Sequence, residues 1–449
     1  MASDAITYIC KRTVVSTKPV QPGKYFPLSV LDRLMEKNHT RIVYYYPSMG
    51  YMEAAGELTK KLRESLSKLL TFFPKVTGRL QKNQEGSWMI KCNDAGVRMV
   101  EARAKGSVDE WLKNVDREKE LKLVYWEDMF HEPYFWSTFY VQLTEFEEGG
   151  LAIGLSCSHL LADPNCATMF IKAWADTTLV GTMHTPPFFH SLPPRKFVNK
   201  KPKHKPYATL INHYKSTMER SIPGTSIAKH ATVTLAFSDP MVRACMTMAL
   251  TPGAPNPSPF QAIAGLFWVC LSKVKGMNEE LIDMSLCLDT REELGLDKGF
   301  FGSCMVYNKV HAEYSLDQNK VAVAARAIGE VVSKMDNEGI MDLIEWLELD
   351  DHNKTLPLIN GYDLICANLE NLDSYWIGFE EGFKPSRVSY YVEPVFGHGQ
   401  ILVLPPPPGD SPLSRMVMVT LSEDEAIKLC QDNLILHFSP TVLMGTNKS

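Results

Sequence analysis

The chain has 449 residues, of which 45% are hydrophobic and 22% are charged. These fractions are typical of folded globular proteins and exclude disordered, collagen-like and coiled-coil classes. With 47 basic and 52 acidic residues, the net charge of −5 creates no overall field that would attract nucleic acid or an anionic membrane. The length is sufficient for two or more domains of ordinary size.

No segment is typical of a membrane span. The longest apolar stretches, Leu151–Ala162 and Phe260–Leu271, are shorter than the roughly 20 residues that a spanning helix needs. The first residues lack the basic and apolar regions of a secretory signal. Ten cysteines without a Cys-x-x-Cys pair favour reduced thiols over a disulfide framework, so we expect a cytosolic protein.

The first part of the chain predicts an amphipathic helix and a β-hairpin. Leucines recur at helical spacing along Glu53–Phe72, and Pro74 marks the end of that helix. Trp136–Glu145 and Leu151–His159 are rich in aromatic or aliphatic residues and are joined by a short segment with two glycines. This pattern predicts two antiparallel strands.

A proline-rich connection follows and predicts a domain boundary. Six prolines lie between Thr185 and Pro206 with few periodic apolar residues, which is typical of an extended linker. We therefore expect an N-terminal domain over residues 1–185, a crossover loop over 186–225 and a C-terminal domain over 226–449. A segment near 366–395 is a candidate to pack with the N-terminal domain.

The second half mixes helical and strand patterns, which predicts an α/β fold with a substantial mixed sheet. Helices are expected at Ser258–Lys275, at Ser315–Trp346 with an interruption near Asn337–Gly339, and from Ser422 onward. Strands are expected at Ala231–Phe237, Met284–Leu288, Arg387–Val392 and Gln400–Leu404, with Arg415–Leu421 as the last strand.

A histidine and an aspartate lie at a predicted strand-to-helix junction, His159-Leu160-Leu161-Ala162-Asp163-Pro164. Such a histidine is either a buried structural residue or a catalytic one at the rim of a sheet. Asp163 directly before Pro164 is the pattern of a helix N-cap followed by an N1 proline, and this capping role stands beside any other.

A Cys157–His159 nucleophile pair is disfavoured. Residues two apart on a strand lie about 6.5–7 Å apart along it, which is beyond the hydrogen-bond reach of a general base. Cys157 is therefore interpreted as a packed thiol.

Other kinds of site find little support. His184, His190 and His204 are irregularly spaced without acidic neighbours, so no metal site is expected. No glycine-rich phosphate loop is present in the sequence. The basic cluster Arg195–Lys205 fits a solvated loop, a nuclear-import-like patch or a contact with acidic lipid.

Several motifs together resemble the plant BAHD acyltransferases. The sequence has His-x-x-x-Asp at 159–163, and its Leu62–Leu80 segment ends in Thr-Gly-Arg-Leu as a family helix and turn do. Ser258–Gly276 is similar to the family helix with a central tryptophan. Asp289-Thr290-Arg291 and Gly299-Phe300-Phe301-Gly302-Ser303 are similar to the family's Asp-x-Arg and Gly-Tyr-Phe-Gly-Asn.

This resemblance implies a two-domain, chloramphenicol-acetyltransferase-like fold with mixed sheets and a channel between the domains. It implies that His159 is the general base that deprotonates a hydroxyl or amine acceptor as the acceptor attacks acyl-CoA, the co-substrate. Asp163 would turn away from His159, pair with Arg291 and hold the loop. A monomer without a bound cofactor or metal is expected. An imidazole with a reference pKa of about 6.5 suits this chemistry near neutral pH.

One family motif is degenerate, which introduces a second interpretation. Phe379–Pro385 reads FEEGFKP and keeps only the Lys-Pro end of Asp-Phe-Gly-Trp-Gly-Lys-Pro. The eceriferum/glossy proteins of cuticular wax formation share this loss and look similar at Lys91–Ala102 and Gly149–His159. That resemblance implies a non-catalytic partner of a ketoacyl-CoA synthase in very-long-chain fatty acid elongation, peripheral at the cytosolic face of the ER. The intact His159, Asp163 and Arg291 set favours catalysis.

Overall fold

The computed structural model describes residues 5–19, 23–48, 56–84, 86–127, 136–195, 206–219, 229–277, 279–312, 319–349 and 362–445. The chain forms two compact units. The first contains Met1–Leu192 together with two segments from the second half, Asp297–Ser303 and Asp373–Pro394. The second contains Pro193–Leu296, Cys304–Leu372 and Val395–Ser449.

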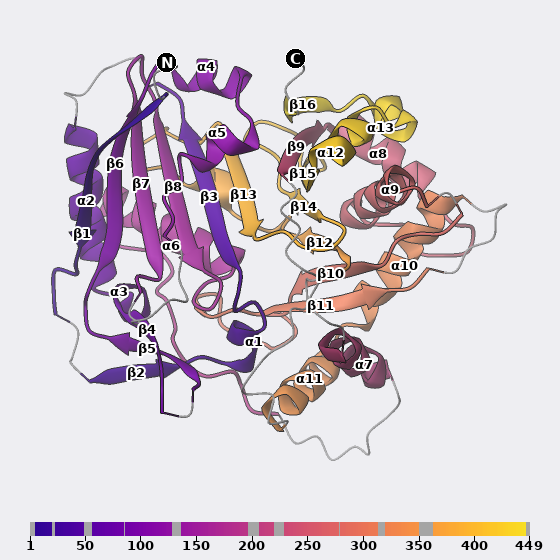
Figure 1. The fold of residues 1–449 in the computed structure, drawn as a ribbon, viewed down its shortest axis with the longest axis horizontal. Helices are drawn as coiled ribbons and strands as arrows, with labels where there is room; N and C mark the ends of the chain where they lie inside the picture. Colours follow the sequence, from indigo (N-terminus) through magenta and orange to yellow (C-terminus); the bar gives the residue numbers. More distant parts are fainter. Residues whose placement is uncertain are drawn as a thin grey trace. The chain divides into compact units, whose positions relative to one another are not determined.

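A six-stranded mixed sheet forms the centre of the first unit (Figure 1). Its strand order is β1-β6-β7-β8-β3-β13, and only the β6–β7 pair is parallel among these neighbours. The strands are β1 (Ile6–Val14), β3 (His39–Tyr46), β6 (Val97–Ala104), β7 (Phe139–Phe146), β8 (Leu151–Ser158) and β13 (Arg387–Glu393). A separate small sheet has the order β2-β5-β4, with β2 (Lys24–Pro27), β4 (Arg79–Lys82) and β5 (Trp88–Cys92).

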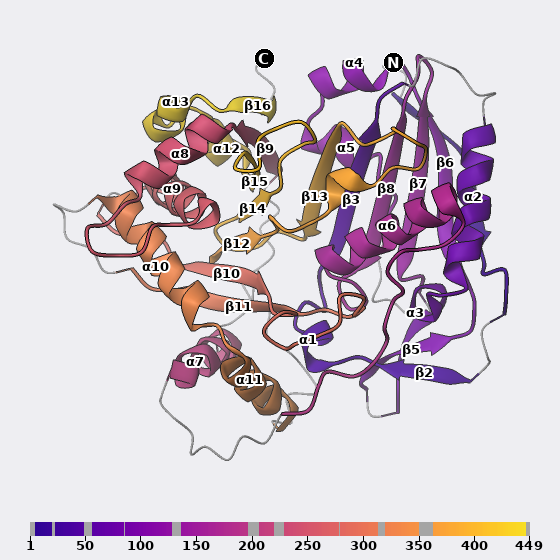
Figure 2. The same ribbon diagram turned by 180° about the vertical axis from the view of Figure 1, so that it is seen from behind.

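The helices of the first unit pack around this sheet, and α6 lies across one of its faces (Figure 2). They are α1 (Val30–Arg33), α2 (Glu57–Leu70), α3 (Pro74–Thr77), α4 (Val108–Lys113), α5 (Arg117–Leu121), α6 (Pro164–Val180) and the 3-10 helix η2 (Ser374–Trp376). The turn that follows α5 approaches β8 closely, since a β-carbon on Gly154 would lie 2.1 Å from the carbonyl oxygen of Leu123. Only glycine permits this contact.

The helix and hairpin that the sequence predicts in this unit are confirmed. The leucine face of α2 is buried, and the helix begins at Glu57, while residues 51–55 lie outside the described residues. β7 and β8 pair antiparallel. β7 begins three residues after Trp136, because Trp136 forms an isolated bridge with Leu80 instead.

A seven-stranded mixed sheet forms the centre of the second unit. Its order is β11-β10-β12-β14-β15-β9-β16, with parallel pairs β10–β12 and β12–β14. The strands are β9 (His230–Phe237), β10 (Met284–Asp289), β11 (Met305–Val310), β12 (Leu364–Asn368), β14 (Gln400–Leu404), β15 (Arg415–Ser422) and β16 (Thr441–Met444). Both units therefore carry the mixed sheets that the sequence predicts.

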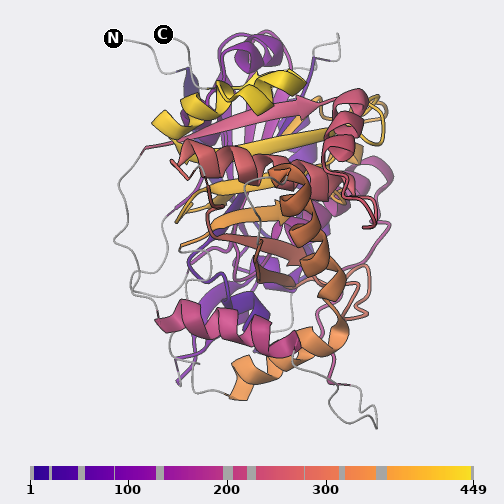
Figure 3. The same ribbon diagram turned by 90° about the vertical axis from the view of Figure 1, so that its right-hand side faces the viewer.

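Two helices, α9 and α10, lie side by side over one face of this second sheet (Figure 3). The helices of the unit are α7 (Pro206–Glu219), α8 (Asp239–Met248), α9 (Pro259–Val274), α10 (Lys320–Lys334), α11 (Asn337–Leu349), α12 (Glu423–Cys430) and α13 (Asn433–Phe438). The predicted interruption of the helix over Ser315–Trp346 is confirmed. Met335 and Asp336 separate α10 from α11, and Asp336 accepts a hydrogen bond from the Gly339 N–H at 2.9 Å. The predicted positions 315–318 lie outside the described residues.

Two expectations about this half differ from the structure. The sequence predicts a crossover loop over 186–225, but Pro206 begins helix α7. The buried positions Leu210, His213, Tyr214 and Thr217 of this helix have helical spacing, although few of them are aliphatic. The sequence also predicts Arg415–Leu421 as the last strand, whereas the short β16 follows and pairs with β9 at the sheet edge. Four residues are too few to give a strand pattern.

Neither disulfide bonds nor membrane-spanning helices are found in the described part of the chain. All ten cysteines lie in the described part of the chain and are thiols, not disulfides. Across the described residues, no helix has both the length and the hydropathy that a membrane crossing requires.

Strand β13 is bonded to its unit from both faces. On one face the hydroxyl of Tyr390 lies 2.8 Å from Thr168 Oγ1 of α6 and 2.7 Å from Ser374 Oγ of η2. On the other face, the fully buried carboxylate of Glu120 in α5 accepts a hydrogen bond of 3.0 Å from Ser389 Oγ. Because alternate residues of a strand point to opposite faces, two helices contact the same strand.

Replacing Tyr390 by Phe is expected to destabilise the first unit by about 1–3 kcal/mol, because Thr168 and Ser374 lose a buried hydrogen-bond partner. Urea unfolding followed by tryptophan fluorescence measures this loss. Tyr25→Phe is the matched control, because Tyr25 is 45% exposed, and its effect is expected to stay within about 0.5 kcal/mol. Equal stabilities of the two variants would contradict the role of the Tyr390 hydroxyl.

Candidate active site

His159 begins the turn that follows β8. Its N–H donates to the carbonyl oxygen of Asn38 at 3.0 Å, and its side chain is buried. The turn is closed by Ser158, whose Oγ accepts from the Leu160 N–H at 3.3 Å and whose carbonyl accepts from the Leu161 N–H at 3.0 Å. The main chain of His159 is therefore bonded on the β3 side of the sheet.

Asp163 is the N-cap of α6. Its Oδ1 accepts a hydrogen bond from the Cys166 N–H at 2.9 Å, and Pro164 occupies the first helical position. The aspartate is fully buried. The predicted capping role is confirmed, and it fixes the spacing between His159 and the start of the helix.

Cys157 is a packed thiol. It is buried, and its Sγ–H donates to the carbonyl oxygen of Ala162 at 3.7 Å. Burial raises the pKa of Cys157 well above its ordinary value, and the nearby groups of Cys166 and Asp163 raise it further. A thiolate nucleophile is accordingly disfavoured at this position.

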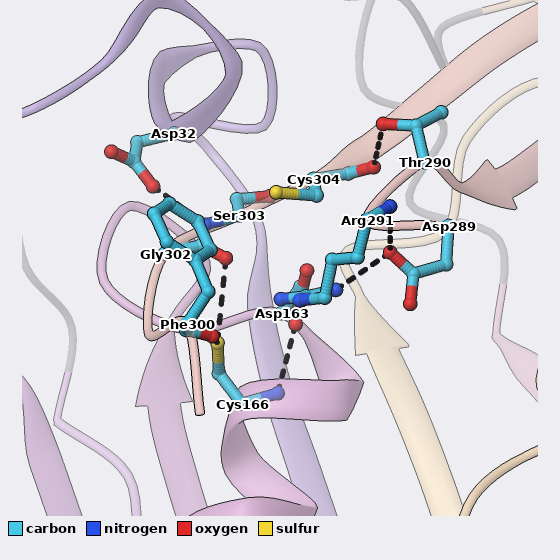
Figure 4. Close-up of polar contacts among 10 residues, drawn as sticks. All are labelled: Asp32, Asp163, Cys166, Asp289, Thr290, Arg291, Phe300, Gly302, Ser303 and Cys304. Carbon is cyan, nitrogen blue, oxygen red and sulfur yellow. Dashed lines mark hydrogen bonds and ion pairs between the residues drawn. The ribbon is translucent and has the colours of Figure 1, made fainter. Parts of the chain in front are cut away.

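The segment Asp297–Ser303 packs against the start of α6 within the first unit (Figure 4). Cys166 Sγ donates to the carbonyl oxygen of Gly302 at 3.4 Å. The Ser303 N–H donates to Oδ1 of Asp32 at 2.7 Å, and Asp32 also forms the capping box of α1. Burial raises the pKa of Asp32, although the charge of Lys75 and the bond from Ser303 oppose that rise.

Arg291, the third predicted site residue, belongs to the second unit. Its NH1 lies 2.7 Å from Oδ1 of Asp289, in an ion pair that Figure 4 draws. The intervening Thr290 is bonded through both its N–H and its Oγ1 to the carbonyl oxygen of Cys304, at 3.0 and 2.8 Å. Within this unit Arg291 is thus held beside Asp289, and the pair of Asp163 with Arg291 stays a prediction.

Asn38 contacts the His159 turn and was not found by sequence reasoning. It is 2% exposed, and its Nδ2 donates to the carbonyl oxygen of Pro394 at 3.2 Å. No local motif links this residue to His159, because the Asn38-His39-Thr40 sequon around it indicates glycosylation and not a contact with a distant turn. It could be found only from the pairing of β3 with β8 and β13, which joins segments more than 100 residues apart.

An ion cluster whose side chains are 11–17% exposed lies at the adjoining end of β3 and β13. Arg41 Nε lies 3.0 Å and His39 Nε2 3.6 Å from Oε2 of Glu393, and Arg117 of α5 pairs with Oε1. The His39 ring stacks on Trp126 with centroids 4.3 Å apart. Burial alone would raise the pKa of Glu393, but the bond from His39 and the charges of Arg117 and Arg41 lower it to about 2.

The degenerate segment Phe379–Pro385 forms a packed turn in the first unit. Gly382 has a φ of +74°, which favours glycine, and the Phe383 N–H bonds back to the Glu380 carbonyl at 3.0 Å. The rings of Phe379 and Phe383 lie 5.8 and 5.0 Å from that of Tyr46. Aromatic packing thus stabilises this turn without the family's Asp-Phe-Gly-Trp-Gly sequence.

The two units with mixed sheets and the histidine turn at the end of β8 define an acyltransferase fold of the BAHD type. A family model described as "Transferase family" matches residues 4–433. The chain belongs to this family, and its relatives place it with the plant BAHD proteins related to the eceriferum group.

Two curated relatives and one solved structure illustrate the similarity. "Protein ECERIFERUM 26-like" of Arabidopsis thaliana is 26% identical over 93% of this chain and 92% of its own length. Rosmarinate synthase of Plectranthus scutellarioides is 29% identical over 91% of this chain and 95% of its own. The structure of F. sporotrichioides TRI101, in complex with coenzyme A and T-2, has a TM-score of 0.69 at 15% identity, covering 94% of this chain and all of its own. This last likeness shows the fold.

Glu393→Gln is expected to remove stability that depends on pH. Since the pKa of Glu393 falls from 4.5 to about 2 on folding, the carboxylate contributes about 3 kcal/mol above pH 4.5, and this contribution is lost as the pH falls toward 2. Wild type should exceed the variant in unfolding free energy at pH 7, and the difference should shrink across that window. Denaturant unfolding at a series of pH values measures it; a difference that does not change with pH would contradict the ion cluster.

Proposed function

We propose that this protein is an acyl-CoA-dependent acyltransferase that acts on a hydroxyl or amine acceptor, with His159 as the general base. The observation that carries this proposal is the placement of His159. It lies directly after a fully buried strand, its main chain is bonded to Asn38, and Asp163 caps the next helix four residues later. Membership of the Transferase family supports the same reaction class.

The proposed chemistry needs one base in a fixed position. The imidazole of His159 takes the proton of the acceptor as its oxygen or nitrogen attacks the thioester carbonyl. Collapse of the tetrahedral intermediate breaks the carbon–sulfur bond, and the proton passes from His159 to the leaving CoA sulfur. The products are an ester or amide and free CoA. A positioned general base contributes roughly 10²–10⁴ in rate.

Asp163 and Arg291 would act on the loop and not on the substrate. The carboxylate of Asp163 already accepts from the Cys166 N–H at the start of α6. We propose that Asp163 also pairs with Arg291. In this role both residues hold the turn that carries His159, and neither exchanges a proton with the acceptor.

His159→Ala is expected to lower acceptor-dependent CoA release by about 10²–10⁴-fold, because the acceptor proton then has no positioned base. The assay mixes purified protein with medium-chain, very-long-chain and aromatic acyl-CoAs and pooled hydroxyl and amine acceptors, and follows the free thiol. His184→Ala is the matched control, because the His184 side chain is 73% exposed and pairs with Asp176 at the surface. An unchanged rate in folded His159→Ala protein would refute the proposed base.

A second candidate function is a non-catalytic accessory role in very-long-chain fatty acid elongation with a ketoacyl-CoA synthase. Two observations favour it. The curated relatives include ECERIFERUM proteins, and the Phe379–Pro385 turn keeps its packing without the family's motif. This role would use the surface of the protein and would not require proton transfer by His159.

For the accessory role, co-expression with the condensing enzyme is expected to shift the chain length of the elongation products, and His159→Ala is expected to shift it equally. Gas chromatography of the fatty acyl products measures the shift. A shift that disappears with His159→Ala would favour catalysis by this chain, and no shift at all would contradict the accessory role.

A further inference from the structure

We propose that Asn38 is a positioning residue for His159, and that its side-chain amide joins the strand that ends before Pro394 to the turn that begins at His159. The inference deepens the proposed acyltransferase function and rests on it. The contacts of Asn38 fix the His159 turn whether or not the protein transfers an acyl group.

Paired residues of three neighbouring strands, β8, β3 and β13, place Asn38 beside His159. His39 pairs with Ser158 of β8 on one side and with Glu393 of β13 on the other. One step beyond these pairs, Asn38 lies between His159 and Pro394. Its carbonyl oxygen accepts from the His159 N–H at 3.0 Å, and its Nδ2 donates to the Pro394 carbonyl oxygen at 3.2 Å. One residue therefore bonds to both neighbours.

The side chain of Asn38 supplies the donor to the Pro394 carbonyl oxygen because the main-chain N–H of Asn38 is bonded to Met35. Pro394 has no N–H, so it cannot donate a main-chain bond to β3. The side-chain amide of Asn38 donates to the carbonyl oxygen of Pro394. The main-chain N–H of Asn38 donates to the carbonyl oxygen of Met35 at 2.9 Å. With its N–H and its side-chain amide both bonded, the peptide group of Asn38 has little freedom to turn its carbonyl away from His159.

The acceptor of the Asn38 amide is itself held in place. Glu393 precedes Pro394 and is surrounded by Arg41, Arg117 and His39. The ion cluster, the Pro394 carbonyl, the Asn38 amide and the His159 N–H thus form a continuous series of contacts within the first unit. Small displacements of a base from its productive position cost up to about 10² in rate, so such a series matters for catalysis.

The test compares Asn38→Ala and Asn38→Asp with Gln142→Ala. Both Asn38 variants lose the amide donor. Gln142 is the matched control, because it is a fully buried amide of the same sheet, donating to the Lys122 carbonyl at 3.0 Å, and it pairs with Gly154 and not with the His159 turn. Three quantities are measured: the thermal midpoint, kcat and KM in the CoA-release assay, and the pH titration of the ¹³Cε1-labelled histidines by NMR, with the His159 signal assigned from its loss in His159→Ala.

The expected result is a fall of about 10–100-fold in kcat for Asn38→Ala, with KM changed less than threefold, and a displaced His159 resonance. Gln142→Ala should lower the thermal midpoint similarly and leave kcat and the His159 resonance unchanged. Active wild-type protein with unaltered kcat and an unmoved resonance in both Asn38 variants would overturn the positioning role and leave the proposed function standing. If wild type transfers no acyl group, the function fails, and the His159 resonance alone decides the role of Asn38.

Discussion

The pairing of β13 with β3 is the constraint on which the first unit depends. β13 comes from residues 387–393, far along the chain from β3, yet it completes the sheet that carries the candidate site. Tyr390 on one face and Glu120 against the other connect it to α6 and α5. Because both helices contact this strand, the turn after β8 is supported by residues from the start, the middle and the end of the sequence.

The pairing of β3 with β8 and the cap of α6 explain how the buried His159 has a defined position. Hydrogen bonds to the main chain of His159 and a capped helix four residues later set the two ends of the turn. Buried main-chain groups are nearly always bonded, so the turn has few alternative conformations. The neighbouring Cys157 does not take part as a nucleophile, because its buried thiol has a raised pKa and stays protonated.

The packing of the degenerate segment Phe379–Pro385 is relevant to both candidate functions. Phe379 and Phe383 bury their rings against Tyr46, which is part of β3, so the altered turn still supports the sheet. The loss of the family sequence is therefore compatible with an intact fold around His159. This packing is compatible with both candidate functions, and only catalysis requires proton transfer by His159.

Local patterns in the sequence determined the elements with strong periodicity and the polar residues with a local role. The leucines of α2, the β7–β8 hairpin, the break between α10 and α11, and Asp163 before Pro164 are all visible as short-range signals, because helix faces, turns and caps depend on neighbouring residues. The motifs also indicated the mixed two-unit fold. Helix α7 and strand β16 were missed, because one has a buried face of His, Tyr and Thr and the other has four residues.

Tertiary structure alone decided which distant residues surround His159. No motif links Asn38, Pro394 and the ion cluster at Glu393 to His159, and they meet only because β3 pairs with β8 on one side and β13 on the other. The sequence by itself placed His159 at a strand end and Asp163 at a helix start, and the proposed role of His159 as a base rests on the resemblance to the family. The support for that histidine comes from strand pairing across more than 100 residues, and such pairing is set by the packing of the whole unit and not by any local pattern.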